Sequence, residues 1–442
     1  MLGIVSTKFG QLKGVCKQDY TVFRGVPYAK PPVGDLRWKA PVEPDCWDGV
    51  RQADRFGTRC MSTVQEPGAF YYKEFFADED YIPAMSEDGL YLNVWTPAES
   101  GEERLPVAFW IHGGAFSGGF GTELEFDGEA FCRQGVILVT INYRLGALGF
   151  LAHPELSAED PDGHSGNYGI LDQIAALKWV YENIAAFGGD PGRITVFGQS
   201  AGAMSVQTLV SSPLTRGMIA GAILQSGGGY QSLSRDVTLK EMQEIGAGFL
   251  AHCGVSSVRE LREMDSETIS RFSNEYFVEC ARKGIGGLPF VPCIDGYVLH
   301  SGYNAAIESG DIADIPYMLG STKNDVGATP ENPETGPGSM LYEGCINWSR
   351  YLEKLGRAPA HVYWFTRAPL GDDAGAFHSA ELWYVFGTLH RSWRPKTEAD
   401  YALSRQMVAH WCSFVKTGNP NGDSLPQWKP CTEQDPFVLE LS

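Results

Sequence analysis

The chain has 442 residues, of which 43% are hydrophobic and 20% charged, a composition typical of a large globular protein with a buried core. Its 54 acidic and 35 basic side chains give a formal net charge of −19 at pH 7. Because such a surface repels phosphate backbones and anionic lipid headgroups, the charge argues against nucleic-acid binding and against a membrane partner.

The N-terminus and the cysteines predict the cellular compartment. The segment Met1 to Thr7 has neither a basic nor a long apolar part, and the longest apolar run, Val136 to Ile141, is too short to span a bilayer. The ten cysteines are scattered and form no C-x-x-C pair. We therefore expect a cytoplasmic protein with reduced thiols and no membrane anchor, metal site or cofactor.

The first part of the chain predicts irregular and β structure. Residues 3–26 alternate apolar and polar side chains, which indicates short hairpins, whereas 27–60 are rich in Pro, Gly and Trp and indicate irregular chain. The acidic and aromatic segment 66–88 indicates a surface loop or short helix, either at a pocket mouth or simply in solvent.

From residue 90 onward, buried strands alternate with helices. The pattern predicts helices at 170–184 and 203–209 and strands at 90–96, 107–111, 136–142, 194–197 and 222–224. Residues around 231–310 are more charged and helical, with runs at 238–252 and 256–264, and predict a cap or side insertion. We then expect a strand at 315–319, a Gly/Pro-rich loop at 327–339, a last strand at 361–365 and a closing helix at 397–417.

This rhythm predicts an α/β fold in which a mostly parallel sheet carries helices on both faces. No repeat or low-complexity linker interrupts it, so we expect residues 1–442 to form one domain with a reduced helical insertion.

The segment Gly198-Gln199-Ser200-Ala201-Gly202 is the chemical centre of the sequence. It lies between an apolar β-branched run and a helix-forming run, which is the context of a G-x-S-x-G nucleophile elbow. The flanking glycines permit the tight turn, and the helix N-terminus favours developing negative charge near Ser200. A simple small-residue turn is the alternative.

A nucleophilic serine needs a base and an orienting acid, which follow it in this architecture on loops after strands. Of the later histidines, at 252, 300, 361, 378, 390 and 410, only His378 lies in the loop after the strand at 361–365. Asp325 is the first carboxylate after the strand at 315–319. Glu331 and Glu334 are rivals for the acid, and Asp325 could instead cap its own turn.

Backbone donors for a tetrahedral intermediate are expected in two places. The segment His112-Gly113-Gly114-Ala115 follows a strand upstream of the serine, and Ala201 directly follows it. The loop lacks the spacing of a Walker or dinucleotide motif.

Motifs over nearly the whole length resemble those of type-B carboxylesterases, the family of carboxylesterases, cholinesterases and para-nitrobenzyl esterases. They include Phe23-Arg24-Gly25-Val26-Pro27-Tyr28-Ala29, Ser86-Glu87-Asp88-Gly89, Asn142-Tyr143-Arg144, the elbow, His378 with Glu381, and Thr417-Gly418-Asn419-Pro420-Asn421. The resemblance implies an α/β-hydrolase fold and ester hydrolysis through an acyl-enzyme. It also implies Gly114, Ala115 and Ala201 as oxyanion donors, with Gly113 shaping the loop. We expect Gln199, Ser226 and Glu381 to support the site as well.

The chain departs from the family in three places. Gly89 stands where secreted members have a cysteine, so Cys60 lacks its usual partner. Gln199 replaces the glutamate of cholinesterases, which argues against a choline-type cation as substrate. Val326 stands where the family's acid usually precedes glycine. The chain is also shorter than animal members of the family, with the loss in the cap region, which predicts a more open entrance to the active site.

We therefore expect a prokaryotic serine hydrolase that acts on small to medium carboxylic esters. Amide, thioester or lactone cleavage at the same site is the alternative, and a non-catalytic binding protein is disfavoured because Ser200 and His378 are present. The sequence leaves the oligomeric state open between monomer and dimer.

Overall fold

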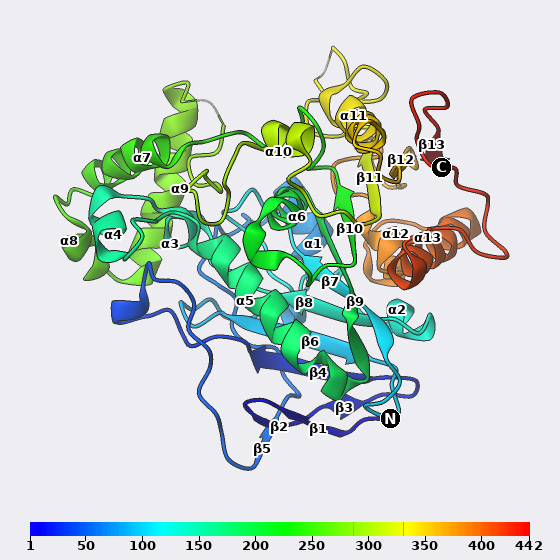
Figure 1. The fold of residues 1–442 in the computed structure, drawn as a ribbon, viewed down its shortest axis with the longest axis horizontal. Helices are drawn as coiled ribbons and strands as arrows, with labels where there is room; N and C mark the ends of the chain where they lie inside the picture. Colours follow the sequence, from blue (N-terminus) through cyan, green and yellow to red (C-terminus); the bar gives the residue numbers. More distant parts are fainter. Residues whose placement is uncertain (286, 330) are drawn as a thin grey trace.

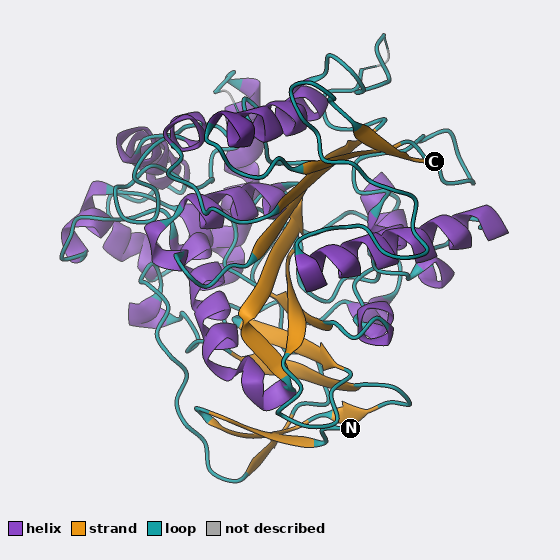
Figure 2. Ribbon diagram, turned by 45° about the vertical axis from the view of Figure 1, so that its right-hand side comes forward, coloured by secondary structure: helices purple, strands orange, loops and turns teal. Residues whose placement is uncertain are grey.

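A computed structural model describes residues 1–285, 287–329 and 331–442. Within them, a ten-stranded twisted sheet runs through the molecule (Figures 1 and 2). Its strands, from one edge to the other, are β13 (Val438–Leu441), β12 (His361–Phe365), β11 (Tyr317–Thr322), β10 (Gly221–Gln225), β9 (Gly189–Gln199), β7 (Leu105–Ile111), β8 (Ile137–Ile141), β6 (Tyr91–Thr96), β4 (Thr21–Pro27) and β3 (Val15–Cys16).

The strands from β13 to β8 are parallel, and β6, β4 and β3 continue the sheet in antiparallel pairs. In the centre, Gly198 of β9 pairs with Ile111 of β7, and Gln199 pairs with Gln225 of β10. Because parallel strands end at the same edge, the loops after β7, β9 and β10 meet there.

Side chains of the central strands alternate between two cores. On β7, Phe109 and Ile111 join the core on one face, whereas Ala108 and Trp110 join the core on the other. All four are fully buried. Because both faces of the strand are covered, its sequence is an unbroken apolar run and does not alternate between apolar and polar residues.

Helices cover both faces of the sheet (Figure 2). On one face α6 packs on β9 and β10 beside α5, and on the other α13 packs on β7 and β9. The helices that follow the sheet strands are α2 (Glu129–Arg133), α5 (Tyr168–Asn183), α6 (Ala201–Ser211), α11 (Met340–Lys354), α12 (Leu382–Val385) and α13 (Glu398–Thr417). The fold class predicted from the sequence is thus confirmed.

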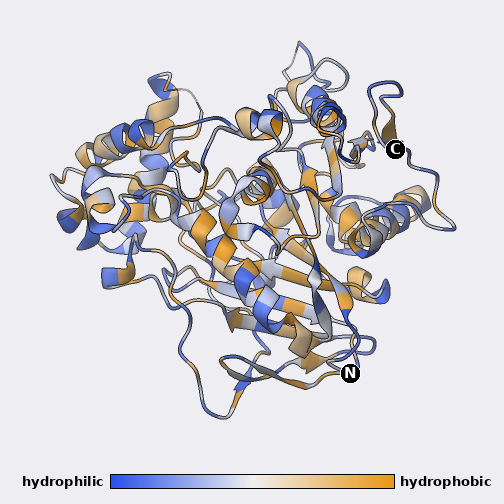
Figure 3. Cartoon of the chain, in the orientation of Figure 1, coloured by the Kyte–Doolittle hydropathy of each residue, from blue (hydrophilic) through white to orange (hydrophobic). Residues whose placement is uncertain are grey.

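The segment 231–310 forms a helical group beside the sheet. It contains α7 (Leu239–His252), α8 (Val258–Arg262), α9 (Ser266–Arg282) and α10 (Tyr303–Ser309). Thr238 and Glu241 form a reciprocal capping box on α7, and Asp265 caps α9. Hydrophilic residues are frequent along α7 and α9 on the left of Figure 3, in keeping with their outer position.

The remaining elements are short. A separate sheet contains β1 (Ile4–Thr7), β2 (Gly10–Lys13) and β5 (Val50–Gln52), and three short helices are α1 (Phe70–Phe75), α3 (Gly146–Phe150) and α4 (Pro154–Glu159). Single 3₁₀ turns occur at Gly34–Leu36, Glu79–Tyr81, Ile184–Phe187, Pro213–Thr215 and Leu389–Arg391. None of the described helices is long and apolar enough to span a membrane.

One sequence prediction about the sheet was wrong. The strand at 361–365 is not the last one, because β13 follows α13 and pairs in parallel with β12, with Val438 beside Val362. β13 has only four residues, and just Leu441 is buried, so it carries no apolar run that sequence patterning detects.

Candidate active site

Ser200 lies at the sharp turn between β9 and α6. Its φ of 58° is in the region that side chains rarely adopt, and its N–H donates to Gln225 O at 2.8 Å. The neighbouring β10 thus holds the strained turn in place. The half-buried side chain of Ser200 lines a cavity.

The glycines around Ser200 are required by space. A Cβ at Gly198 would lie 2.5 Å from the backbone of Gly202, and one at Gly202 would collide with Ile111 O. The elbow therefore packs backbone against backbone at the ends of β7 and β9, and larger residues at the two positions would push the turn outward.

The cavity beside Ser200 has a volume of about 340 Å³. Its lining is mainly apolar and comes mainly from the loop after β7, from α6 and from the segments 233–235 and 287–292. The described lining residues are Ala115, Phe116, Ser200, Met204, Leu233, Ser234, Arg235, Gly287, Leu288, Val291, Pro292, Tyr303 and Val326. Such a mainly apolar hollow with few polar groups is typical of a small-molecule site.

His378 and Asp325 are held together by the loops after β12 and β11. The Nδ1–H of His378 donates to Asp325 Oδ1 at 2.5 Å, and the carboxylate is fully buried. Asn324 joins the two loops, because its N–H donates to Ala376 O and its Oδ1 accepts from Ala376 N. The Tyr71 hydroxyl of α1 donates to His378 O at 3.2 Å.

Asp325 is also fixed by its own loop. Its Oδ2 accepts from Thr322 N at 2.8 Å, and its N–H donates to Thr335 Oγ1 at 2.8 Å. Its rivals lie elsewhere: Glu334 is exposed and pairs with Lys323 at 3.0 Å, and Glu331 is exposed. Of the three carboxylates considered from the sequence, only Asp325 contacts the imidazole in the described residues.

Burial and mutual charge act in opposite directions on the pKa values of Asp325 and His378. Burial alone would raise the pKa of Asp325, but the His378 charge and the hydrogen bonds to the carboxylate hold that pKa below its usual value. Burial likewise opposes the charged form of His378, but Asp325 raises the pKa of His378 above its ordinary 6.5.

The side chain of Gln199 faces the other nitrogen of His378. Its Nε2 lies 3.1 Å from His378 Nε2, and the glutamine is buried. Since Asp325 accepts the Nδ1 proton, Nε2 is left as the unprotonated nitrogen of a neutral imidazole. The same amide nitrogen lies 3.5 Å from His378 Nδ1, so it contacts the ring near both nitrogens. The described residues include no hydrogen bond between Ser200 Oγ and His378. Sequence reasoning missed this contact.

The loop after β7 aims its backbone toward Ser200. A Cβ at Gly113 would lie 2.8 Å from Gln199 O and 3.1 Å from Ser200 Cβ, so only glycine fits there. Gly114 and Ala115 have φ of 105° and 55°. In the described residues, the N–H groups of Gly114 and Ala115 have no protein acceptor. Unpaired donors beside a cavity are suited to bind an anionic oxygen.

Glu381 and Ser226 lie behind the pair. Burial, with the charge of Asp325, raises the pKa of Glu381 to about 7. Gln225 Nε2 donates to Glu381 Oε1 at 3.3 Å. Ser226 is buried with φ of 52°, and its N–H donates to Gly320 O. These two residues thus belong to the polar interior below the site and do not line the cavity.

Two groups of side chains outside the cavity carry atoms of the kind that bind metals: His112, and the loop with Asp160, Asp162 and His164. His112 is buried and stacks on Tyr143, its Nδ1 contacts Gly113 O at 2.8 Å, and burial lowers its pKa to about 4. In the described residues, the acidic loop Asp160, Asp162 and His164 could gather ligand atoms, but Asp160 Oδ1 already accepts from the N–H groups of the other two. Neither group belongs to the cavity beside Ser200.

Comparisons with known proteins identify the class. The parallel sheet with helices on both faces and the strand–serine–helix turn define an α/β-hydrolase fold. The model of the carboxylesterase family matches residues 2–335 and 345–442, and the chain belongs to this family. It is a carboxylic ester hydrolase.

The chain is similar to characterised esterases over almost all of its length. It is 34% identical to the fumonisin B1 esterase of Sphingopyxis macrogoltabida, over 96% of this chain and 83% of that one. It is also 34% identical to the para-nitrobenzyl esterase of Bacillus subtilis strain 168, over 99% of this chain and 94% of that one. A thermophilic PNB esterase structure superposes with a TM-score of 0.87 and 31% identity, covering 100% of this chain and 96% of the other.

Proposed function

We propose that Ser200 is the nucleophile, that His378 is the general base and that Asp325 orients the imidazole. The observation that carries this proposal is the 2.5 Å hydrogen bond between His378 Nδ1 and Asp325 beside a serine at a strained elbow that opens into a cavity. The N–H groups of Gly114, Ala115 and Ala201 complete the site as oxyanion donors.

In the first half of the reaction, Ser200 Oγ attacks the ester carbonyl carbon and its proton passes to His378 Nε2. The carbonyl oxygen becomes an oxyanion that accepts hydrogen bonds from the three N–H groups. The carbon–oxygen bond to the alcohol then breaks, and the alcohol leaves with the proton from His378. In the second half, water repeats these steps on the acyl-enzyme and releases the acid.

In the unliganded site, the Gln199 amide contacts the His378 imidazole. Its nitrogen lies within 3.5 Å of both ring nitrogens of His378, and no hydrogen bond joins Ser200 Oγ to His378 in the described residues, so the serine–imidazole hydrogen bond has to form when substrate binds. Such rearrangement from a resting geometry is common in unliganded sites. The neutral amide adds no charge beside the serine.

The mainly apolar cavity supports esters of small to medium carboxylic acids as substrates. The experiment is a series of 4-nitrophenyl esters of increasing acyl length, assayed beside a matched thioester and a matched anilide, with Ser200→Ala as the control. We expect ester hydrolysis that Ser200→Ala abolishes. If the variant keeps a tenth of the activity, Ser200 is not the nucleophile.

The compartment and the domain organisation stay predictions. All ten cysteines are free thiols, which supports a reducing, cytoplasmic location. The helices of segment 231–310 pack beside the sheet, which supports one domain with a side insertion.

A further inference from the structure

The cavity beside Ser200 has one charged side chain in its described lining. This residue is Arg235, which is exposed, while most of the wall is formed by residues such as Phe116, Met204 and Leu288. No carboxylate is among the described lining residues. A guanidinium beside an apolar wall can bind an anionic group at the end of an apolar chain.

Arg235 has no ion pair within the described residues. Two carboxylates nearby in the chain are engaged in other contacts: Asp236 Oδ1 accepts from Tyr303 N at 2.7 Å, and Glu241 accepts from Thr238 in the capping box of α7. The guanidinium instead lies over the backbone of Gly287, because a Cβ there would be 3.5 Å from Arg235 Cζ. Its hydrogen-bond donors are therefore available to a ligand.

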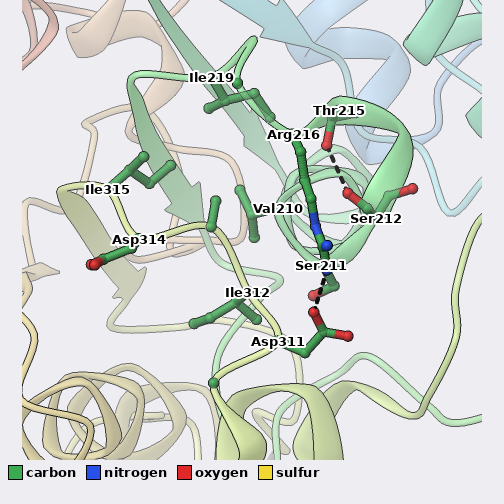
Figure 4. A pocket seen from close by; sticks show the side chains of 13 residues that line it. Val210, Ser211, Ser212, Thr215, Arg216, Ile219, Asp311, Ile312, Asp314 and Ile315 are labelled. Carbon is green, nitrogen blue, oxygen red and sulfur yellow. Dashed lines mark hydrogen bonds and ion pairs between the residues drawn. The ribbon is translucent and has the colours of Figure 1, made fainter.

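A second hollow offers a direct contrast (Figure 4). It lies between the end of α6 and the segment 310–315, away from Ser200, and its arginine, Arg216, points at Asp311 with an N–O distance of 2.5 Å. That cation is already neutralised within the protein. Arg235 forms no such ion pair within the residues that the structure describes.

Resting on the function proposed above, we infer that the preferred substrates carry a carboxylate at the far end of the ester chain that enters this cavity, as a half-ester of a dicarboxylic acid does. The apolar wall takes the methylene chain, and the Arg235 guanidinium binds the carboxylate, for which its planar fork of donors is suited. In a chain with a net charge of −19, an anionic substrate needs such a local cation.

The experiment compares mono(4-nitrophenyl) adipate with 4-nitrophenyl hexanoate, which share the chain length and the leaving group and differ in the terminal carboxylate. The quantity measured is the ratio of kcat/KM for the half-ester to kcat/KM for the neutral ester. We expect Arg235→Gln to lower this ratio about tenfold and Arg235→Lys to lower it less, since lysine keeps the charge but loses the fork. High salt should lower the ratio of the wild-type protein, because the arginine is exposed.

Arg216→Gln is the matched control, because it removes the same charge at the other hollow, and it should leave the ratio unchanged. An unchanged ratio in Arg235→Gln, or an equal loss in Arg216→Gln, would overturn the inference while leaving esterase activity intact. Failure of the wild-type protein to cleave either ester would contradict the proposed function itself, and the inference with it.

Discussion

Asp325 and His378 are joined by a 2.5 Å hydrogen bond although 53 residues separate them in the chain. The bond exists because β11 and β12 are parallel neighbours, with Met318 beside His361, so that their following loops meet at one edge of the sheet. Asn324 then ties the two loops together. A short aspartate thus reaches the imidazole from a loop that is itself fixed.

Replacing Asp325 by asparagine is expected to lower kcat by about 10³- to 10⁴-fold, because the amide no longer holds the imidazole in the tautomer that accepts the serine proton. Steady-state kinetics with a 4-nitrophenyl ester checks this, and far-UV circular dichroism checks the fold. Glu331→Gln and Glu334→Gln are the controls and should stay active. Loss of activity in either control, with an active Asp325→Asn, would move the acid to that glutamate.

The activity should fall on the acidic side with an apparent pKa above 6.5. Asp325 raises the pKa of His378, and only the neutral imidazole accepts a proton. As the pH falls through that raised pKa, the base is lost and kcat/KM decreases. The profile of kcat/KM between pH 5 and 9 measures the midpoint. A profile that is flat down to pH 5 would contradict the role of His378.

Gln199→Glu is expected to move this acidic limb upward by about one pH unit, because a carboxylate beside His378 Nε2 favours the imidazolium. Gln199→Met keeps the size without the charge and should not move the limb upward. The same pH profile is recorded for both variants. Identical limbs in Gln199→Glu and the wild-type protein would show that residue 199 does not face the ring.

Gly113→Ala should reduce kcat by about 10²- to 10³-fold, because the new Cβ would press on Gln199 O and displace the N–H donors of the loop. Gly118→Ala is the matched control on the same loop, since its Cβ would meet only ordinary contacts, the nearest at 3.8 Å. KM should change less than kcat in Gly113→Ala. Equal kinetics of the two variants would refute the assigned role of the loop.

The cysteines should all react as free thiols once the protein is denatured. In the folded protein only Cys16 and Cys46 are exposed, and the other eight are buried. Mass spectrometry after alkylation should therefore find two labels under native conditions and ten after denaturation without reductant. Fewer than ten labels in the denatured sample would indicate a disulfide and argue against a reducing compartment.

Local signals made much of the fold and of the candidate site predictable. The elbow around Ser200 combines an apolar strand, two glycines and a helix within about ten residues. Because all three features lie in one short segment, the sequence alone predicts the turn. His378 and Asp325 could be proposed only from their order after strands. Their contact depends on the pairing of β11 with β12, and no local sequence pattern predicts that pairing.

The features that sequence reasoning missed depend on tertiary contacts or on weak local patterns. β13 is a short edge strand with one buried residue. α11 directly follows the Gly/Pro-rich loop at 327–339 and was not predicted, although Leu341, Cys345 and Leu352 follow a helical spacing. The contact of Gln199 with His378 and the presence of Arg235 in the cavity lining arise only when distant segments fold together.

The central claim is that Ser200 becomes covalently acylated during catalysis. Its most direct test is to treat the native protein with a fluorophosphonate probe and map the modified residue by peptide mass spectrometry. The account predicts one adduct, on Ser200, which is absent from Ser200→Ala and strongly slowed in His378→Ala. An adduct on another residue, or labelling that persists in Ser200→Ala, would contradict it.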